Sequence, residues 1–203
     1  MASAIELIAT AFGGGVLTLI GQEGLRYIRR PRLTISFEDK AEYLSRTPIH
    51  WPKVFDDPAS GTVELEAIYL RVKVLNVGKS TARSCRAYIT HVERENFDGS
   101  TEKIEAQDSI PIPWSLRGER SLEPFDLPGR INQFADVCFT ISRDHPHKLF
   151  PAAPMFPLRF RRSWDKPGRF RLEITVTADG ISSVSKTIKF EWQGPWDTLR
   201  FLD

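Results

Sequence analysis

The chain of 203 residues has little of what catalytic centres commonly use: it contains only two cysteines and four histidines. It also lacks the GxSxG, Walker A, HExxH and GxGxxG motifs, so the mechanisms that depend on those motifs have no support in the sequence. Its formal net charge is only +2, which predicts no global attraction to nucleic acid or membranes and leaves any electrostatic partner to local patches. We therefore expect a protein that is not an enzyme, that has no cofactor or catalytic residue, and that does not bind nucleic acid.

Long apolar stretches are also scarce, with one exception at the N-terminus. Residues 7–22 carry no charge and would rise about 24 Å as a helix, whereas a bilayer core needs ~30 Å. Including the flanking apolar residues extends the segment to 4–28. We predict a transmembrane helix there, with a cleaved signal peptide and a buried or oligomerising soluble helix as alternatives.

The flanks of this segment differ in charge. Four arginines lie between Arg26 and Arg32, whereas the N-terminal side has no basic side chain. By the positive-inside tendency, this asymmetry predicts a single-pass membrane protein whose C-terminal domain is cytoplasmic. Ala11 and Gly15, like Ala9 and Gly13, form small-xxx-small pairs. They raise the possibility of a homodimer through the glycine-rich helix, although small apolar filler is the simpler interpretation.

After Pro31 the hydrophobic period changes to two, which is typical of β-strands. Leu33, Ile35 and Phe37 start the first strand, and the clearest run places Leu70, Val72 and Val74 on one face. Further alternating runs bring the count to about eight strands, and they are centred on residues 85–90, 104, 110–114, 135–141, 158–160, 170–176 and 188–192. The stretch 40–61 is rich in Pro, Asp and Ser, and we interpret it as a long surface connection.

About eight short strands without a helical pattern between them predict an all-β fold, an antiparallel β-sandwich. A closed barrel is the alternative, because alternation and strand number do not distinguish the two. The predicted organisation is an anchor helix with its basic flank at 1–30, a sandwich at 31–193 and an amphipathic tail at 194–203.

Three landmarks recur in order along the body of the chain: "YLRVKVLNVGKSTARSC", "LPGRINQFADVCFTI" and "KPGRFRLEITVTADG". Their turns, Asn76 with Gly78, Pro128 with Gly129, and Pro167 with Gly168, resemble those of bacterial immunoglobulin-like modules of the cell-adhesion-related (CARDB-like) kind. The resemblance covers about residues 65–192. It implies an immunoglobulin-like sandwich that serves as a spacer or binding module. Such modules are common outside the cytoplasm, so on sidedness it disagrees with the charge asymmetry.

The two cysteines differ in strand phase. Cys85 lies on the apolar phase of its strand, whereas Cys138 lies opposite Val137 and Phe139 on the polar phase. A bridge across the core would need both side chains to point inward. The pattern therefore predicts two free thiols, which suits a reducing compartment.

One short cluster has potential metal ligands. Asp144, His145 and His147 lie close together in "DHPHK". A zinc site usually has three or four protein ligands, and the cysteines lack CxxC spacing. A polar loop is the simpler interpretation, so we expect no metal, while an accessory metal-binding or enzymatic domain centred here is the alternative function.

A cationic segment, residues 159–171, has six basic residues interleaved with aromatic ones and opposed only by Asp165. Such a cluster can contact phosphates or anionic headgroups. Its candidate contact residues, which we expect on a hairpin with Trp164 near the tip, are Arg159, Arg161, Arg162, Trp164, Lys166 and Arg169. A solvated hairpin is the simpler interpretation. A soluble β-domain that binds an anionic partner, including nucleic acid, is a further alternative.

The C-terminal tail "GPWDTLRFLD" combines a proline with large apolar residues, and Pro195 suits the first turn of a short helix. Either the tail docks onto the sandwich or it binds a partner. Its candidate partner-binding residues are Trp196, Leu199, Phe201 and Leu202. Taken together, the sequence predicts a membrane-anchored, non-enzymatic binding or scaffolding module with the lipid bilayer and an unknown protein as partners.

Overall fold

The computed structural model describes residues 30–54, 57–104, 109–142, 148–153, 164 and 166–202, of which 51–54, 57–60 and 104 are described by their backbone alone. We call this part of the chain the β-domain. No helix within these ranges is long and apolar enough to cross a membrane. The predicted anchor at residues 4–28 lies outside the described residues, as do the metal-ligand candidates Asp144 to His147 and the predicted strand at 158–160.

The fold is all-β, and its strands are antiparallel, as the alternating pattern predicted. Twelve strands form two sheets in the described part of the chain, and a 3-10 turn occupies Gly118–Arg120. The five-stranded sheet contains β1 (Leu33–Ser36), β2 (Leu44–Val54), β3 (Asp57–Asn76), β8 (Asn132–Ile141) and β9 (Phe150–Pro151). The seven-stranded sheet contains β4 (Ala82–Glu95), β5 (Thr101–Ile104), β6 (Ile110–Ile112), β7 (Phe125–Leu127), β10 (Gly168–Thr177), β11 (Val184–Trp192) and β12 (Arg200–Phe201).

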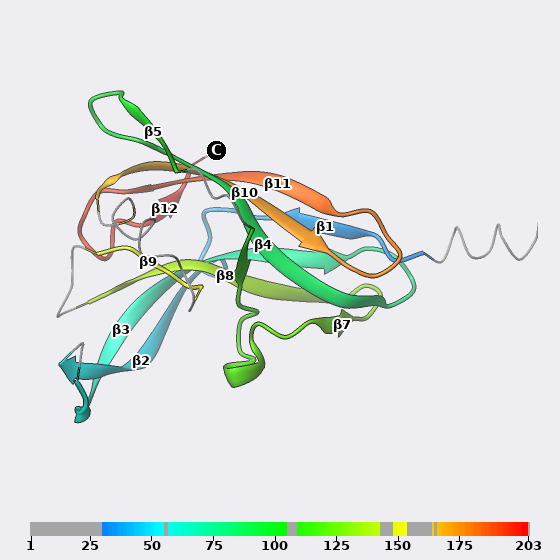
Figure 1. Ribbon diagram of the computed structural model, residues 1–203, viewed down its shortest axis with the longest axis horizontal. Coiled ribbons are helices and arrows are strands. Elements are labelled where there is room, and N and C mark those ends of the chain that lie inside the picture. The colour runs from blue at the N-terminus through cyan, green and yellow to red at the C-terminus, as the bar shows by residue number, and fades with distance from the viewer. Residues whose placement is uncertain are drawn as a thin grey trace, which may run out of the picture.

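Two long strands organise these sheets (Figure 1). β3 pairs with β2 and then β1 along one edge and with β8 along the other. β4 pairs with β10 on one side, and β5, β6 and β7 share its other side. β11 and β12 continue the second sheet beyond β10.

The inward faces of both sheets contribute to one hydrophobic core. Val72 and Val74 of β3, Ile89 of β4 and Leu172 and Ile174 of β10 all have 0% exposure. These are the apolar-phase residues of the alternating runs, so burial follows the sequence pattern directly.

The stretch 40–61 differs from the expected surface connection. It forms β2 and the first residues of β3. β2 pairs along β3 from Leu44 opposite Leu70 to Val54 opposite Asp57. The hairpin extends away from the body of the domain in Figure 1. β2 contains Pro48 and Pro52, and proline is tolerated there because β2 lies at a sheet edge.

Both cysteines are free, as predicted, but the phase argument for Cys138 is wrong. Cys138 is fully buried, like Val137 beside it. The register between β3 and β8 shifts at this point, since Leu70 lies opposite Cys138 and Arg71 opposite Asp136. This irregularity turns two consecutive side chains inward, which simple alternation does not allow.

The chain enters the β-domain at a tightly packed junction of residues 30–32, 76–80 and 127–131. The buried Asn76 side chain holds these segments together: its Oδ1 accepts from the backbone N–H groups of Arg32 and Gly78, each at 3.1 Å. Its Nδ2 donates to the carbonyl groups of Ser80 at 2.8 Å and Leu127 at 3.0 Å. All four hydrogen-bonding positions of the amide are therefore used.

Two glycines make this close approach possible. A Cβ on Gly78 would lie 2.4 Å from the Arg30 carbonyl oxygen, and one on Gly129 would lie 2.5 Å from the Lys79 carbonyl oxygen. Both obstacles are backbone atoms, which cannot rotate away. The Asn-x-Gly landmark at residues 76–78 and the first Pro-Gly landmark, at residues 128–129, thus meet at the junction.

Candidate functional site

A charged groove of about 560 Å³ lies on the outward face of the seven-stranded sheet. Its lining includes charged side chains of both signs from β4, β10, β11 and β12, together with Leu202. The strand register explains its composition, because residues two apart on a strand point to the same face.

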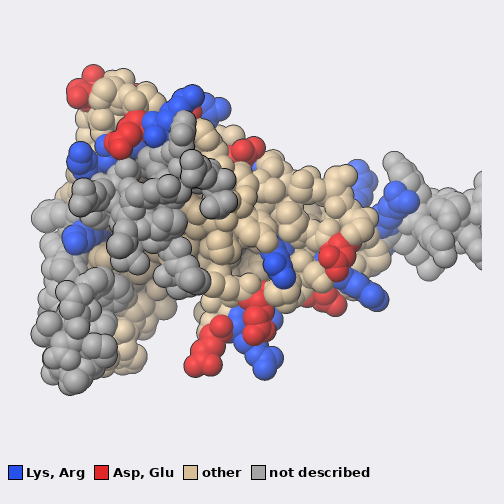
Figure 2. All heavy atoms as spheres, in the orientation of Figure 1, with Lys and Arg blue, Asp and Glu red and all other residues tan. Residues whose placement is uncertain are grey.

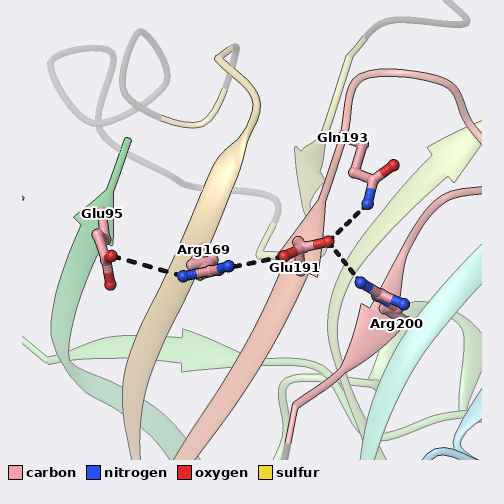
Figure 3. Close-up of polar contacts among 5 residues, drawn as sticks. All are labelled: Glu95, Arg169, Glu191, Gln193 and Arg200. Atoms are coloured by element: carbon pink, nitrogen blue, oxygen red, sulfur yellow. Dashed lines mark hydrogen bonds and ion pairs between the residues drawn. The ribbon is translucent and has the colours of Figure 1, made fainter. Parts of the chain in front are cut away.

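Across the sheet, the charges form a row of alternating sign. Arg169 lies directly between Glu95 of β4 and Glu191 of β11, and Arg200 of β12 lies on the other side of Glu191. Figure 3 shows how these side chains lie between the neighbouring strands. The guanidinium of Arg169 is 3.7 Å from the Glu95 carboxylate and 3.2 Å from that of Glu191. The Arg200 guanidinium is 2.9 Å from Glu191.

Glu191 is the centre of this row. Its side chain is 4% exposed, and its Oε1 also accepts a 2.7 Å hydrogen bond from the amide nitrogen of Gln193. The hydrogen bond from Gln193, with those from Arg200 and Arg169, lowers the pKa of Glu191 below its ordinary value, although burial acts in the opposite direction. Glu191 is therefore a carboxylate at neutral pH, and the row is neutralised internally.

A second row, two residues further along the strands, is less balanced. Arg171 faces Glu93 on one side, with 3.6 Å between guanidinium and carboxylate, and Lys189 on the other. Lys189 is exposed and forms no ion pair with any residue that the structure describes. The groove can thus offer a cation to a ligand in this second row, next to the half-buried Leu202.

The cationic segment is divided by the structure. Arg169 lines the groove, and Lys166 is exposed outside its lining. Trp164, expected near an exposed tip, instead has 0% exposure and stacks on Phe170 with 5.5 Å between ring centroids. Arg159, Arg161 and Arg162 lie outside the described residues.

The tail docks on the β-domain, which is one of the two arrangements considered from the sequence. Leu199 and Phe201 are buried, and β12 replaces the expected short helix. Phe201 stacks on Phe37 at 5.3 Å. Trp196 is half-buried, with the Arg46 guanidinium 5.4 Å from its ring centroid. Leu202 lines the groove, so this part of the tail and Arg169 share one site.

The sequence analysis did not identify the carboxylates of the groove as candidate site residues. Glu93 with Glu95, Arg169 with Arg171, and Lys189 with Glu191 each lie two apart on an outward strand phase. That spacing was a usable signal for charged rows. It does not reveal which strands are neighbours, so the sequence showed the arginines without the groups that pair with them.

A second cavity, of about 290 Å³, has Tyr69, Trp114 and Asp136 in its lining. The Ser115 hydroxyl donates a hydrogen bond to Asp136, and burial raises the pKa of that carboxyl. No histidine lines this cavity among the described residues, and Ser115 itself is not part of the lining. No cluster of three or more His, Cys, Asp or Glu suited to a metal occurs in the described ranges either.

Comparison with known proteins adds no functional assignment. No protein-family model matches the sequence, and no curated protein matches it. One similar solved structure is described as "X-ray structure of Northeast Structural Genomics Consortium target SoR45". It has 10% sequence identity and a TM-score of 0.31, and the alignment covers 78% of this chain and 84% of that one.

Proposed function

We propose that this chain is a membrane-anchored, non-enzymatic binding or scaffolding module with an immunoglobulin-like sandwich. Residues 4–28 form its anchor, and the charged groove is the site that it presents to a protein partner. The resemblance to CARDB-like modules supports the role of the β-domain as a spacer or binding unit.

The observation that carries this proposal is the separation between the junction and the groove. The first described residues, which lead into β1, lie at one end of the long axis of the domain, whereas β12 lies toward the other end (Figure 1). β10 leads away from the groove, from Arg169 to its last residue, Thr177. These two residues are eight positions apart, which is about 26 Å at ~3.3 Å per residue. An anchor joined at residue 30 would therefore hold the groove about one strand length from the bilayer.

Two features support the cytoplasmic side for the β-domain. The arginines between Arg26 and Arg32 favour the cytoplasmic side for the β-domain. The free, buried state of Cys85 and Cys138 agrees with a reducing compartment.

Membrane fractionation combined with protease accessibility in intact cells tests the anchor and its sidedness together. We expect the full chain to remain in the membrane fraction after a carbonate wash, and its β-domain to be digested only after the cells are opened. Recovery in the soluble fraction without detergent would contradict the anchor, and digestion in intact cells would reverse the orientation.

The groove is tested separately by charge reversal. Lys189, which forms no ion pair with the described residues, favours a partner that presents carboxylates. A photo-crosslinker at Leu202 should capture this partner in cells, and Lys189→Glu should reduce the yield several-fold. Lys166→Glu is the matched control, because Lys166 is exposed outside the groove lining. Equal yields from the two variants would exclude recognition through the groove.

A further inference from the structure

Two exposed apolar side chains belong to adjoining segments at the junction. Val77 is 48% exposed and Ile131 is 51% exposed. The backbone N–H of Asn76 donates to the Ile131 carbonyl at 3.0 Å, and that of Val77 donates to the Arg32 carbonyl at 2.8 Å. The two side chains therefore project from neighbouring segments, next to the residues through which the chain enters the domain.

Exposed basic residues flank Val77 and Ile131 in the same segments and in the adjoining turns, and we call the whole surface the junction face. Its exposed basic residues come from the entering segment and the adjoining turns, and they are Arg30, Arg32, Lys79, Arg83 and Arg130. Two exposed carboxylates, Asp126 and Asp179, lie at the same end, and Asp126 accepts a 3.0 Å hydrogen bond from the Ser84 backbone. Figure 2 shows basic side chains, with acidic ones near them, at this narrow end of the domain.

The junction face is also held in a fixed shape. Arg130 has a positive φ of 65°, and its backbone N–H donates to the Asn76 carbonyl at 2.6 Å. The spaces beside Gly78 and Gly129 are filled by backbone atoms. Val77 and Ile131 are thus presented by a packed support, so little conformational entropy is lost when they contact a partner.

We propose that the junction face rests on the anionic headgroups of the bilayer that holds the anchor, with Val77 and Ile131 inserted among them. This inference rests on the proposed function. Exposed apolar side chains flanked by Lys and Arg match the chemistry of an anionic membrane surface.

The length of chain that joins the proposed anchor to the junction face favours the bilayer, rather than a separate protein, as the partner of this face. Eight peptide units join Gln22, at the end of the uncharged run, to Arg30 at the junction face. Fully extended, they span at most about 28 Å. An anchored domain is therefore confined near the headgroups, and the junction face is the surface from which the connection departs.

The test uses the full chain in lipid nanodiscs, either neutral or containing three-tenths phosphatidylglycerol, with a headgroup nitroxide quencher. A fluorophore is attached at Ile131→Cys, or at Phe97→Cys as the control. Phe97 is 56% exposed in the turn after β4, at the end of the domain that carries the groove. Both native cysteines are buried and should remain unlabelled.

In anionic discs we expect quenching at position 131 to exceed that at position 97 at least threefold. Neutral lipid, or the double change Lys79→Glu and Arg32→Glu, should remove most of this difference, with circular dichroism confirming that the variant is folded. Equal quenching at both positions in incorporated protein would overturn the inference and leave the anchor intact. Insensitivity to lipid charge, or protection of position 131 by a second copy of the chain, would also overturn it. A chain that does not enter the discs would refute the proposed function itself, and this inference with it.

Discussion

The two ends of the β-domain are held by different kinds of interaction. At the junction, backbone segments touch each other directly, and the neutral amide of Asn76 makes four hydrogen bonds to them. At the groove, charged side chains pair across the outward face while aromatic rings fill the inward face. The junction should therefore be sensitive to shape, and the groove surface to pH and salt.

The aromatic layer under the groove should give the largest effect. Trp164→Ala removes a fully buried ring that stacks on Phe170 and contacts Phe190. We expect it to lower the free energy of unfolding by about 4 kcal/mol, measured by chemical denaturation. Leu116→Ala, at a side chain that is 96% exposed, should change it little. A small loss of unfolding free energy for Trp164→Ala would mean that the aromatic rings beneath the groove do not stabilise this end of the domain.

The junction amide should come next. Asn76→Ala leaves two N–H groups and two carbonyl groups of the backbone without their partner, at a cost of about 3 kcal/mol. Asn96→Ala is the matched control, because Asn96 donates to Ser100 in an exposed turn and should cost under about 1 kcal/mol. Similar losses for the two variants would show that the junction is not specially constrained.

Adding one methyl group tests the shape of the junction. Gly78→Ala would place a Cβ 2.4 Å from the Arg30 carbonyl oxygen and 2.7 Å from the Arg32 nitrogen, so the segments must separate. We expect a loss of about 2 kcal/mol, seen as a lower melting temperature. Thr81→Ala, at an exposed position after the same turn, should be nearly neutral. An unchanged melting temperature for Gly78→Ala would contradict the close approach.

The outward charges of the groove should give the smallest effect, and one that depends on pH. Glu191→Gln should cost about 1 kcal/mol at pH 7, because both arginine partners are more than half exposed and therefore screened. The folded-state pKa of Glu191 is lowered, so the stabilisation is present above its unfolded pKa and is lost as the pH falls through the lower value.

The difference between wild type and Glu191→Gln should accordingly shrink below about pH 4, the range in which glutamate takes up protons. Denaturation curves between pH 7 and pH 3 measure it, and Glu119→Gln at an exposed position should show no such trend. A constant difference across this range would mean that Glu191 acts through packing rather than charge.

The sequence predicted those parts of the fold in which alternation is regular. β1, the second half of β3, β8, β10 and β11 were found because one face of each is apolar. β2 was missed because Pro48 and Pro52 suggest a loop, and only its position at a sheet edge makes them acceptable. Cys138 was misassigned because a register shift is a property of two paired strands.

The candidate site was predicted in part for a similar reason. Arg169 and Leu202 were identified separately, and the structure brings both into the groove lining. Trp164 was placed on the surface because its neighbours in the chain are basic, whereas packing against Phe170 and Phe190 determines its burial. Glu191 acquires its importance from strands that are distant in the sequence, so no local pattern reveals it.

The two prolines of β2 affect how readily the edge strands of neighbouring molecules could pair. Within the described chain, β2 pairs only with β3, so no described strand covers its other edge, where a strand from a neighbouring molecule would have to pair. Each proline lacks the N–H that such a neighbour would need, which interrupts the hydrogen-bond ladder at two places. In the proposed membrane-anchored arrangement, molecules confined to the plane of the bilayer would meet far more often than molecules in free solution. An edge that resists polymerisation would keep such a population as separate units.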